Sequence, residues 1–165
     1  MRRWQVAGGV IERDGALLLV ENLRRNGSTD WTPPGGVVEL AEGESILEGL
    51  AREVAEETSL LVVEWEGPLY RVEAEAPGLG WLMQVEVHRA VTVAGEPQCG
   101  DDPDGIVVAV EFCSPALVAD RTAPGHLWVH EPLVDWLAER WTDARTYRYL
   151  VEGDHMSDLV ITRRP

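Results

Sequence analysis

Three glutamates, Glu53, Glu56 and Glu57, lie within five positions of the segment AREVAEETSL at residues 51–60. In a helix each residue turns by about 100°, so the three carboxylates would share an arc of roughly 100°. Like charges on one helix face repel one another, so this face either meets only water or lies against a positively charged group. Carboxylate oxygens are the ligands that hard divalent cations prefer. From these residues alone, a solvated acidic face and a metal site are both open interpretations.

The carboxylates need a helix to hold them, and the sequence predicts one. Ser45 and Glu48 have the spacing of a capping box, which predicts a helix from about Ile46 to Thr58-Ser59. An apolar stripe at helical spacing is expected on the side opposite the carboxylates: Leu47, Leu50, Ala51 and Val54. Just upstream lies the glycine-rich segment WTPPGG at 31–36, whose backbone can approach a ligand closely. The glycine-rich loop, the predicted helix and its acidic face therefore form one candidate site.

The rest of the chain is expected to be rich in strands. Apolar runs bounded by turn residues predict strands at 4–12, 16–20, 61–65, 69–74, 81–93 and 106–112. Arg13-Asp14-Gly15 predicts a hairpin turn, and residues 95–105 a polar loop. A second helix is expected at 131–140 with Pro132 in its first turn, followed by a hairpin of 147–152 with 159–162. This mixed order of strands and two helices indicates one α+β or α/β/α domain over residues 1–165.

Composition excludes several classes of function. The chain has 165 residues, 45% of them hydrophobic, and a net charge of −15, which is inconsistent with a disordered tail and argues against nucleic acid as a partner. No apolar run approaches the roughly 20 residues that span a membrane, and the N-terminal residues lack a secretory signal pattern, so a cytoplasmic location is expected. All 14 basic residues are arginines, which excludes a P-loop lysine and a Schiff-base lysine.

The segment Gly36–Leu60 resembles the Nudix box, the signature of the Nudix hydrolases. Glu44 is followed by seven residues and then by Arg52-Glu53-Val54-Ala55-Glu56-Glu57, as in that pattern. Two features depart from it. Seven residues instead of five separate Gly36 from Glu44, and Ser59 stands where the box has its second glycine, which ends the helix. Neither departure alters a carboxylate, but the first puts the role of Gly36 in question.

The resemblance implies a Nudix fold, an α/β/α sandwich with a mixed β-sheet and flanking helices. It also implies hydrolysis of a nucleoside diphosphate linked to another group, with Mg²⁺, or Mn²⁺ as an alternative ion, activating a water that attacks phosphorus. The residues that would hold the metal are Glu53, Glu56, Glu57 and the carbonyl of Gly36. Arg52 would orient the glutamates, and Glu44 would lie next to these residues without binding the metal itself.

The catalytic residues implied are Glu53 and Glu57, with Arg52, and Asp104 of the loop GDDPDG at 100–105. The general base would be a box glutamate or this loop acid. The aspartates of the loop, Asp101, Asp102 and Asp104, also fit ordinary turn positions, because Asp, Pro and Gly favour turns.

Arg24, Arg25 and Trp31 are candidates for binding the nucleotide-derived substrate, although exposed loop arginines and a core tryptophan would look the same in sequence. The resemblance makes a homodimer plausible. An alternative function is a Nudix-like sensor that binds a nucleotide without cleaving it, and a purely structural acidic domain is a third. Oxidised nucleoside triphosphates, ADP-ribose-like compounds, nucleotide sugars and dinucleoside polyphosphates are all open as substrates.

Overall fold

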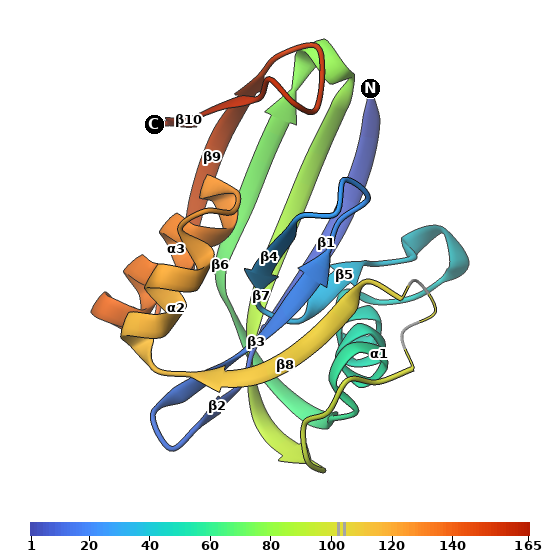
Figure 1. Ribbon diagram of the computed structural model, residues 1–165, viewed down its shortest axis with the longest axis vertical. Helices are drawn as coiled ribbons and strands as arrows, with labels where there is room; N and C mark the ends of the chain where they lie inside the picture. Colours follow the sequence, from blue (N-terminus) through green and yellow to red (C-terminus); the bar gives the residue numbers. More distant parts are fainter. Residues whose placement is uncertain (102, 104) are drawn as a thin grey trace.

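The computed structural model describes residues 1–101, 103 and 105–165 (Figure 1). Two β-sheets form the centre of the molecule. Helix α1 (Ile46–Thr58) covers one side, and helices α2 (Pro115–Thr122) and α3 (Leu127–Glu139) lie together on the other. The predicted α/β/α sandwich with a mixed β-sheet is therefore confirmed.

The larger sheet has six strands and mixed directions. Its strands, in spatial order, are β10 (Val160–Arg164), β9 (Arg145–Glu152), β6 (Leu61–Ala76), β7 (Trp81–Ala94), β1 (Arg2–Val10) and β5 (Gly35–Val37). The pairs β6·β9 and β1·β7 are parallel and the other three pairs are antiparallel. Strand β5 is thus an edge strand, and it places the glycine-rich segment beside β1.

The smaller sheet is antiparallel and is centred on β3 (Ala16–Leu23). This strand pairs with β2 (Glu12–Arg13), β4 (Thr29–Thr32) and β8 (Val107–Cys113). Asp14 and Gly15 join β2 to β3 with φ values of 50° and 79°. Positive φ at both central residues suits a two-residue hairpin, so the predicted turn is confirmed.

Two hydrophobic cores lie on opposite sides of the sheets. The core beneath α2 and α3 includes Leu17, Leu19, Val118, Leu133 and Trp136. The core beneath α1 includes Ala7, Leu18, Leu50, Val54 and Leu60. Because side chains alternate along a strand, β3 sends Leu18 into one core and its two neighbours into the other.

The helices differ in part from those predicted. Helix α1 has the predicted bounds, but α2 was not predicted, and α3 begins at Leu127, so that Pro132 lies inside it and not in its first turn. A start signal for α2 is present, because Ser114 Oγ accepts a hydrogen bond from the Leu117 amide and Pro115 occupies the first turn. Residues 61–76 form a single strand instead of two.

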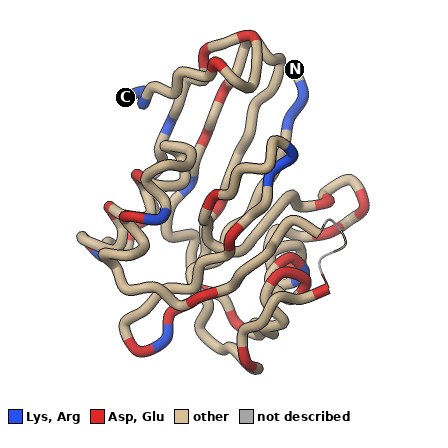
Figure 2. The backbone as a smooth tube through the Cα atoms, in the orientation of Figure 1, with Lys and Arg blue, Asp and Glu red and all other residues tan. Residues whose placement is uncertain are grey.

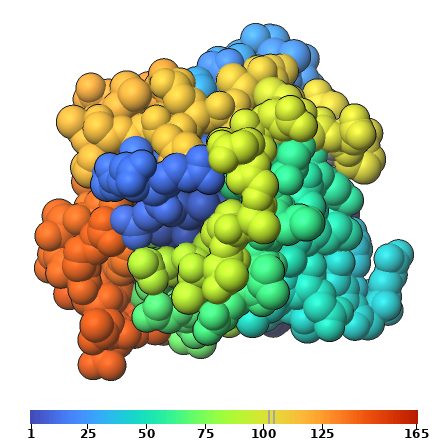
Figure 3. All heavy atoms as spheres, turned by 90° about the horizontal axis from the view of Figure 1, so that it is seen from below, coloured from blue at the N-terminus to red at the C-terminus, as the bar shows by residue number. Residues whose placement is uncertain are grey.

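Two short 3₁₀ helices, η1 (Leu40–Glu42) and η2 (Pro77–Leu79), complete the fold. The loop that contains η1 projects from the body of the protein beside α1 (Figures 1 and 3). Acidic residues gather on α1 and along this loop (Figure 2). Among the helices of the described residues, none has the length and apolar character that crossing a membrane requires.

Candidate active site

Helix α1 carries most of the candidate site, and its start is fixed by local chemistry. Ser45 Oγ accepts a hydrogen bond from the Glu48 amide at 3.1 Å, and Glu48 Oε2 accepts one from the Ser45 amide at 3.5 Å, which forms the predicted capping box. Leu50 and Val54 are fully buried, whereas Leu47 is 40% exposed. The predicted stripe is therefore wrong at Leu47, and the buried face also includes Gly49, Glu57 and Thr58.

The three glutamates of α1 are not a freely solvated face. The side chains of Glu53 and Glu56 are 16% and 27% exposed, and Glu57 is buried with 6% exposure. Burial of a carboxylate is costly unless its charge is compensated. This observation is inconsistent with a freely solvated acidic face, and the charge of the carboxylates must be compensated within the protein or by an ion.

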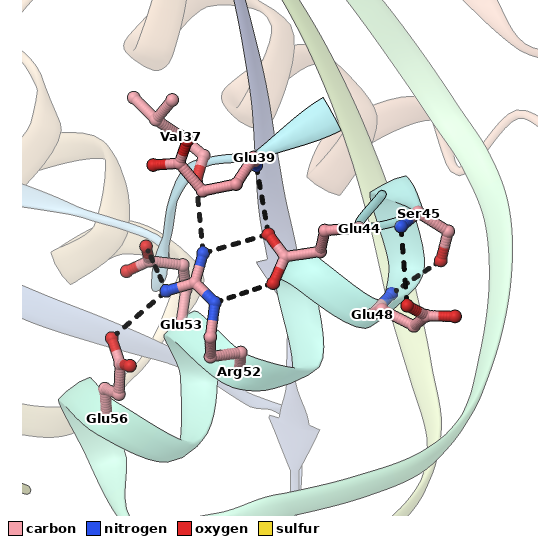
Figure 4. A network of polar contacts seen from close by, with 8 residues as sticks. All are labelled: Val37, Glu39, Glu44, Ser45, Glu48, Arg52, Glu53 and Glu56. Atoms are coloured by element: carbon pink, nitrogen blue, oxygen red, sulfur yellow. Dashed lines mark hydrogen bonds and ion pairs between the residues drawn. The ribbon is translucent and has the colours of Figure 1, made fainter. Parts of the chain in front are cut away.

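Arg52 is the centre of a polar network that gathers carboxylates from the helix and from the preceding loop (Figure 4). Its Nη1 donates to Glu53 Oε1 at 3.0 Å and to Glu56 Oε2 at 3.3 Å. Its Nε and Nη2 donate to the two carboxylate oxygens of Glu44 at 2.7 and 3.0 Å. Nη2 also donates to the carbonyl of Val37 in β5 at 3.3 Å. One guanidinium thus links the helix, the loop and the edge strand.

Glu44, in the loop before α1, holds the Arg52 guanidinium in place. The hydrogen bonds from Arg52, together with one from the Glu39 amide at 3.0 Å, lower the pKa of Glu44 to about 2. Gly49 leaves room for it, because a Cβ at that position would lie 2.7 Å from Glu44 Oε1 and 3.0 Å from Val38 Cγ1. Sequence reasoning missed Gly49, whose small size has meaning only once the path of the Glu44 side chain is known.

Gly36 lies directly against Glu53. It pairs with Ala7 across the sheet, and a Cβ added to it would lie 2.6 Å from Glu53 Cδ and within 3 Å of both carboxylate oxygens. The longer loop between Gly36 and Glu44 therefore does not separate this glycine from the acidic helix. The two extra residues are accommodated in the projecting loop around η1, next to a cavity of about 490 Å³ lined by Glu39, Glu42, Gly43, Glu44, Glu48 and Arg52.

The second departure from the box, Ser59, places a residue other than glycine in a strained backbone conformation. Ser59 ends α1 in the left-handed conformation, with φ 64° and ψ 7°, and its amide donates to the carbonyl of Ala55. This conformation is the one in which a glycine is usual. The helix therefore ends where the box predicts, with a residue that is less suited to the position.

The loop proposed to supply an acid approaches the end of α1. The Gly100 amide donates to the carbonyl of Glu57 at 3.2 Å, and Asp101 follows it as an exposed residue. Asp102 and Asp104 lie outside the described residues, so the role of Asp104 stays a prediction.

The candidate substrate-binding residues lie in the turn between β3 and β4 and in β4 itself. Arg24 Nε and Nη2 donate to the carboxylate oxygens of Asp30, both at 2.8 Å, and Arg25 is exposed in the turn between β3 and β4. Trp31 packs partly against the core, with the Arg121 guanidinium 4.1 Å from its ring centroid. Within the described part of the chain, no hydrogen bond or ion pair joins these three residues to the glutamates of α1.

The donor atoms of the α1 site suit a hard divalent cation, since they are all oxygens and carry an excess of negative charge around one guanidinium. The described ranges contain no ready-made group of three or more metal-binding side chains. Glu53 and Glu56 both point one oxygen at Arg52, so binding would use their other oxygens or a turn of the side chains. With Glu57 and the adjacent Gly36, the residues present fit such an ion.

Comparison with known proteins decides the family. The sequence pattern of the NUDIX domain matches residues 1–137. The chain belongs to the Nudix family. A search of curated proteins gives no significant match.

Solved structures of Nudix proteins share this fold. The E. coli ORF135 protein is 24% identical, with a TM-score of 0.69 over 87% of this chain and 96% of that one. A MutT NUDIX hydrolase from Burkholderia pseudomallei is 25% identical, with a TM-score of 0.60 over 70% and 86%. A MutT protein from Bacillus halodurans is 21% identical, with a TM-score of 0.63 over 98% of each chain. The prediction of a Nudix-type pyrophosphohydrolase is confirmed by the family match together with the B. pseudomallei hydrolase, whereas the other two structures show the shared fold.

Proposed function

We propose that this Nudix protein hydrolyses a phosphoric anhydride bond in a nucleoside diphosphate linked to another group, and that it uses Mg²⁺. The observation that carries the proposal is the convergence of Glu53 and Glu56 on Arg52, with Glu53 held against Gly36. Such a concentration of acid repels a polyanionic substrate unless a cation is present. The acidity of the site therefore supports a metal-dependent reaction on phosphates.

The metal ligands in this proposal are Glu53, Glu56, Glu57 and the carbonyl of Gly36. A divalent ion supplies neutralisation of phosphate charge and activation of water for attack on phosphorus. The buried position of Glu57 would keep its carboxylate in one orientation, where it could also accept a proton from the attacking water. Arg52 would orient the carboxylates of Glu53 and Glu56 through its hydrogen bonds, and Glu44 would hold Arg52 in place.

The first test is hydrolysis of a panel of nucleoside diphosphate derivatives with and without Mg²⁺, with Mn²⁺ as a second ion. The native chain is compared with Glu57→Gln, which keeps the size of the side chain and removes its charge. Glu42→Gln is a matched control, because Glu42 is an exposed glutamate on the projecting loop. We expect metal-dependent turnover that is lost in Glu57→Gln and retained in Glu42→Gln.

The same variants are titrated with Mn²⁺ to measure metal binding independently of turnover. Weaker binding by Glu57→Gln supports its role as a ligand. If the native chain binds Mn²⁺ and nucleotides but releases no product from any member of the panel, the hydrolase proposal is wrong and the chain acts as a nucleotide-binding sensor.

A further inference from the structure

The loop that follows β7 lies against the C-terminal end of α1 and makes backbone contacts there. The Gln98 amide donates to the carbonyl of Thr58 at 3.0 Å, and the Gly100 amide donates to the carbonyl of Glu57 at 3.2 Å. Seen from below, the end of β7 and the loop after it pack closely against α1 (Figure 3). We call residues 96–101 the helix clamp.

The end of α1 has a particular need for these donors. The last carbonyls of a helix have no partner within it, and they form the negative end of the helix dipole. Three glutamates lie in the last two turns, and the last turn has no basic residue. Arg52 compensates only part of the negative charge at this end, and amide donors from another segment provide partners for the helix carbonyls.

Gly100 makes the close approach possible. A Cβ at this position would overlap the carbonyl oxygen of Glu56 and would lie 2.9 Å from its carbonyl carbon and 3.1 Å from the carbonyl oxygen of Ala55. These atoms belong to the helix backbone and cannot rotate away as a flexible side chain can. Any residue other than glycine must therefore lift the clamp from the helix or displace the turn that carries Glu56 and Glu57.

We propose that the helix clamp sets the position of the metal-binding turn of α1, and that Gly100 and Gln98 act as positioning residues through their backbone amides. The inference rests on the proposed metal site. It concerns Gln98 and Gly100, which lie far from the box in sequence and act through their backbone amides. Metal affinity should then depend on a loop that does not touch the metal.

Two variants open the clamp in different ways. Gly100→Ala prevents the close approach, and Gln98→Pro removes one donor amide without adding bulk against Glu56. Gln98→Ala is the matched control, since the Gln98 side chain is exposed and the substitution keeps the amide. Circular dichroism and urea unfolding of each variant establish that the fold is retained, and either clamp variant alone is sufficient for the test.

The readouts are amide hydrogen exchange at residues 98 and 100 and Mn²⁺ affinity. We expect protected amides in the native chain. Exchange should be faster at both positions in Gly100→Ala and at residue 100 in Gln98→Pro, which has no amide hydrogen at residue 98. Mn²⁺ affinity should fall about 10-fold or more in both variants, as for other residues that orient metal ligands. Gln98→Ala should behave as the native chain.

Native Mn²⁺ affinity in a variant whose clamp amides exchange rapidly would overturn the proposal. Unprotected amides at residues 98 and 100 in the native chain would also overturn it. Failure of the proposed function is distinct from both outcomes, because it is seen in the native chain itself, which then binds no Mn²⁺ or releases no product.

Discussion

Arg52 and Glu44 meet through two parallel hydrogen bonds, although one lies on the helix and the other on the loop before it. The Nε–Oε2 distance is 2.7 Å and the Nη2–Oε1 distance is 3.0 Å. This fork leaves Nη1 directed at Glu53 and Glu56. Because the guanidinium is planar and rigid, Glu44 determines which way the remaining donors of Arg52 point.

Replacing Arg52 with lysine tests this geometry while keeping the charge. An ammonium group is a compact donor that cannot form the fork and reach both glutamates in the same plane. We expect Mn²⁺ affinity and turnover to fall about 10- to 100-fold, the usual effect of losing a residue that orients metal ligands. Steady-state kinetics and metal titration measure the two effects. Native values in Arg52→Lys would show that charge alone is sufficient.

The lowered pKa of Glu44 predicts a dependence of stability on pH. Hydrogen bonds from Arg52 lower this pKa from 4.5 to about 2, so the folded state binds the proton less tightly than the unfolded state. The stabilisation from Glu44 is therefore fully present above pH 4.5 and is lost as pH falls toward 2. Urea unfolding of the native chain and Glu44→Gln should show a difference in free energy that shrinks across this window. A difference that stays constant would contradict the assignment.

Ser59→Gly should stabilise the protein. A residue other than glycine in the left-handed conformation costs about 1 kcal/mol or more, and the backbone of Ser59 already adopts that conformation. We expect an increase of about 1 kcal/mol in the free energy of unfolding, measured in urea, with unchanged metal affinity. A decrease in stability would mean that the serine side chain makes a larger contribution than its backbone strain.

Gly36→Ala should damage the site more than the fold. The new Cβ would lie 2.6 Å from Glu53 Cδ and force this carboxylate away from β5. We expect turnover and Mn²⁺ affinity to fall about 10-fold or more. Gly8→Ala, on the neighbouring strand, is the control, because its Cβ would meet only Val87 Cγ2 at 3.4 Å. Equal losses in the two variants would point to a general disturbance of the sheet.

The sequence predicted α1 well because its signals are local. The capping box and the box motif lie within the helix or next to it, and both bounds agree with the structure. The predicted start of α3 was wrong because Pro132 suits a first turn, whereas the helix begins at Leu127, where Leu127 and Trp128 pack against the core. The omission of α2 was avoidable, since Ser114-Pro115 is itself a helix start signal.

The candidate site was predictable in its residue types but not in its contacts. Spacing placed Glu53, Glu56 and Glu57 on one helix face, whereas the burial of Glu57 depends on elements distant in sequence. The space that Gly36 and Gly49 leave for carboxylates likewise depends on where β5 and the preceding loop run. No local sequence pattern indicates how close these glycines come to the carboxylates.

The alternation of Leu17, Leu18 and Leu19 along β3 ties the two halves of the molecule together. Because one strand supplies side chains to both cores, disruption of β3 would remove packing contacts from both cores at once. The two sides should therefore melt in one cooperative transition, so that a calorimetric scan shows a single heat-absorption peak and a probe near α1 reports the same midpoint as one near α3.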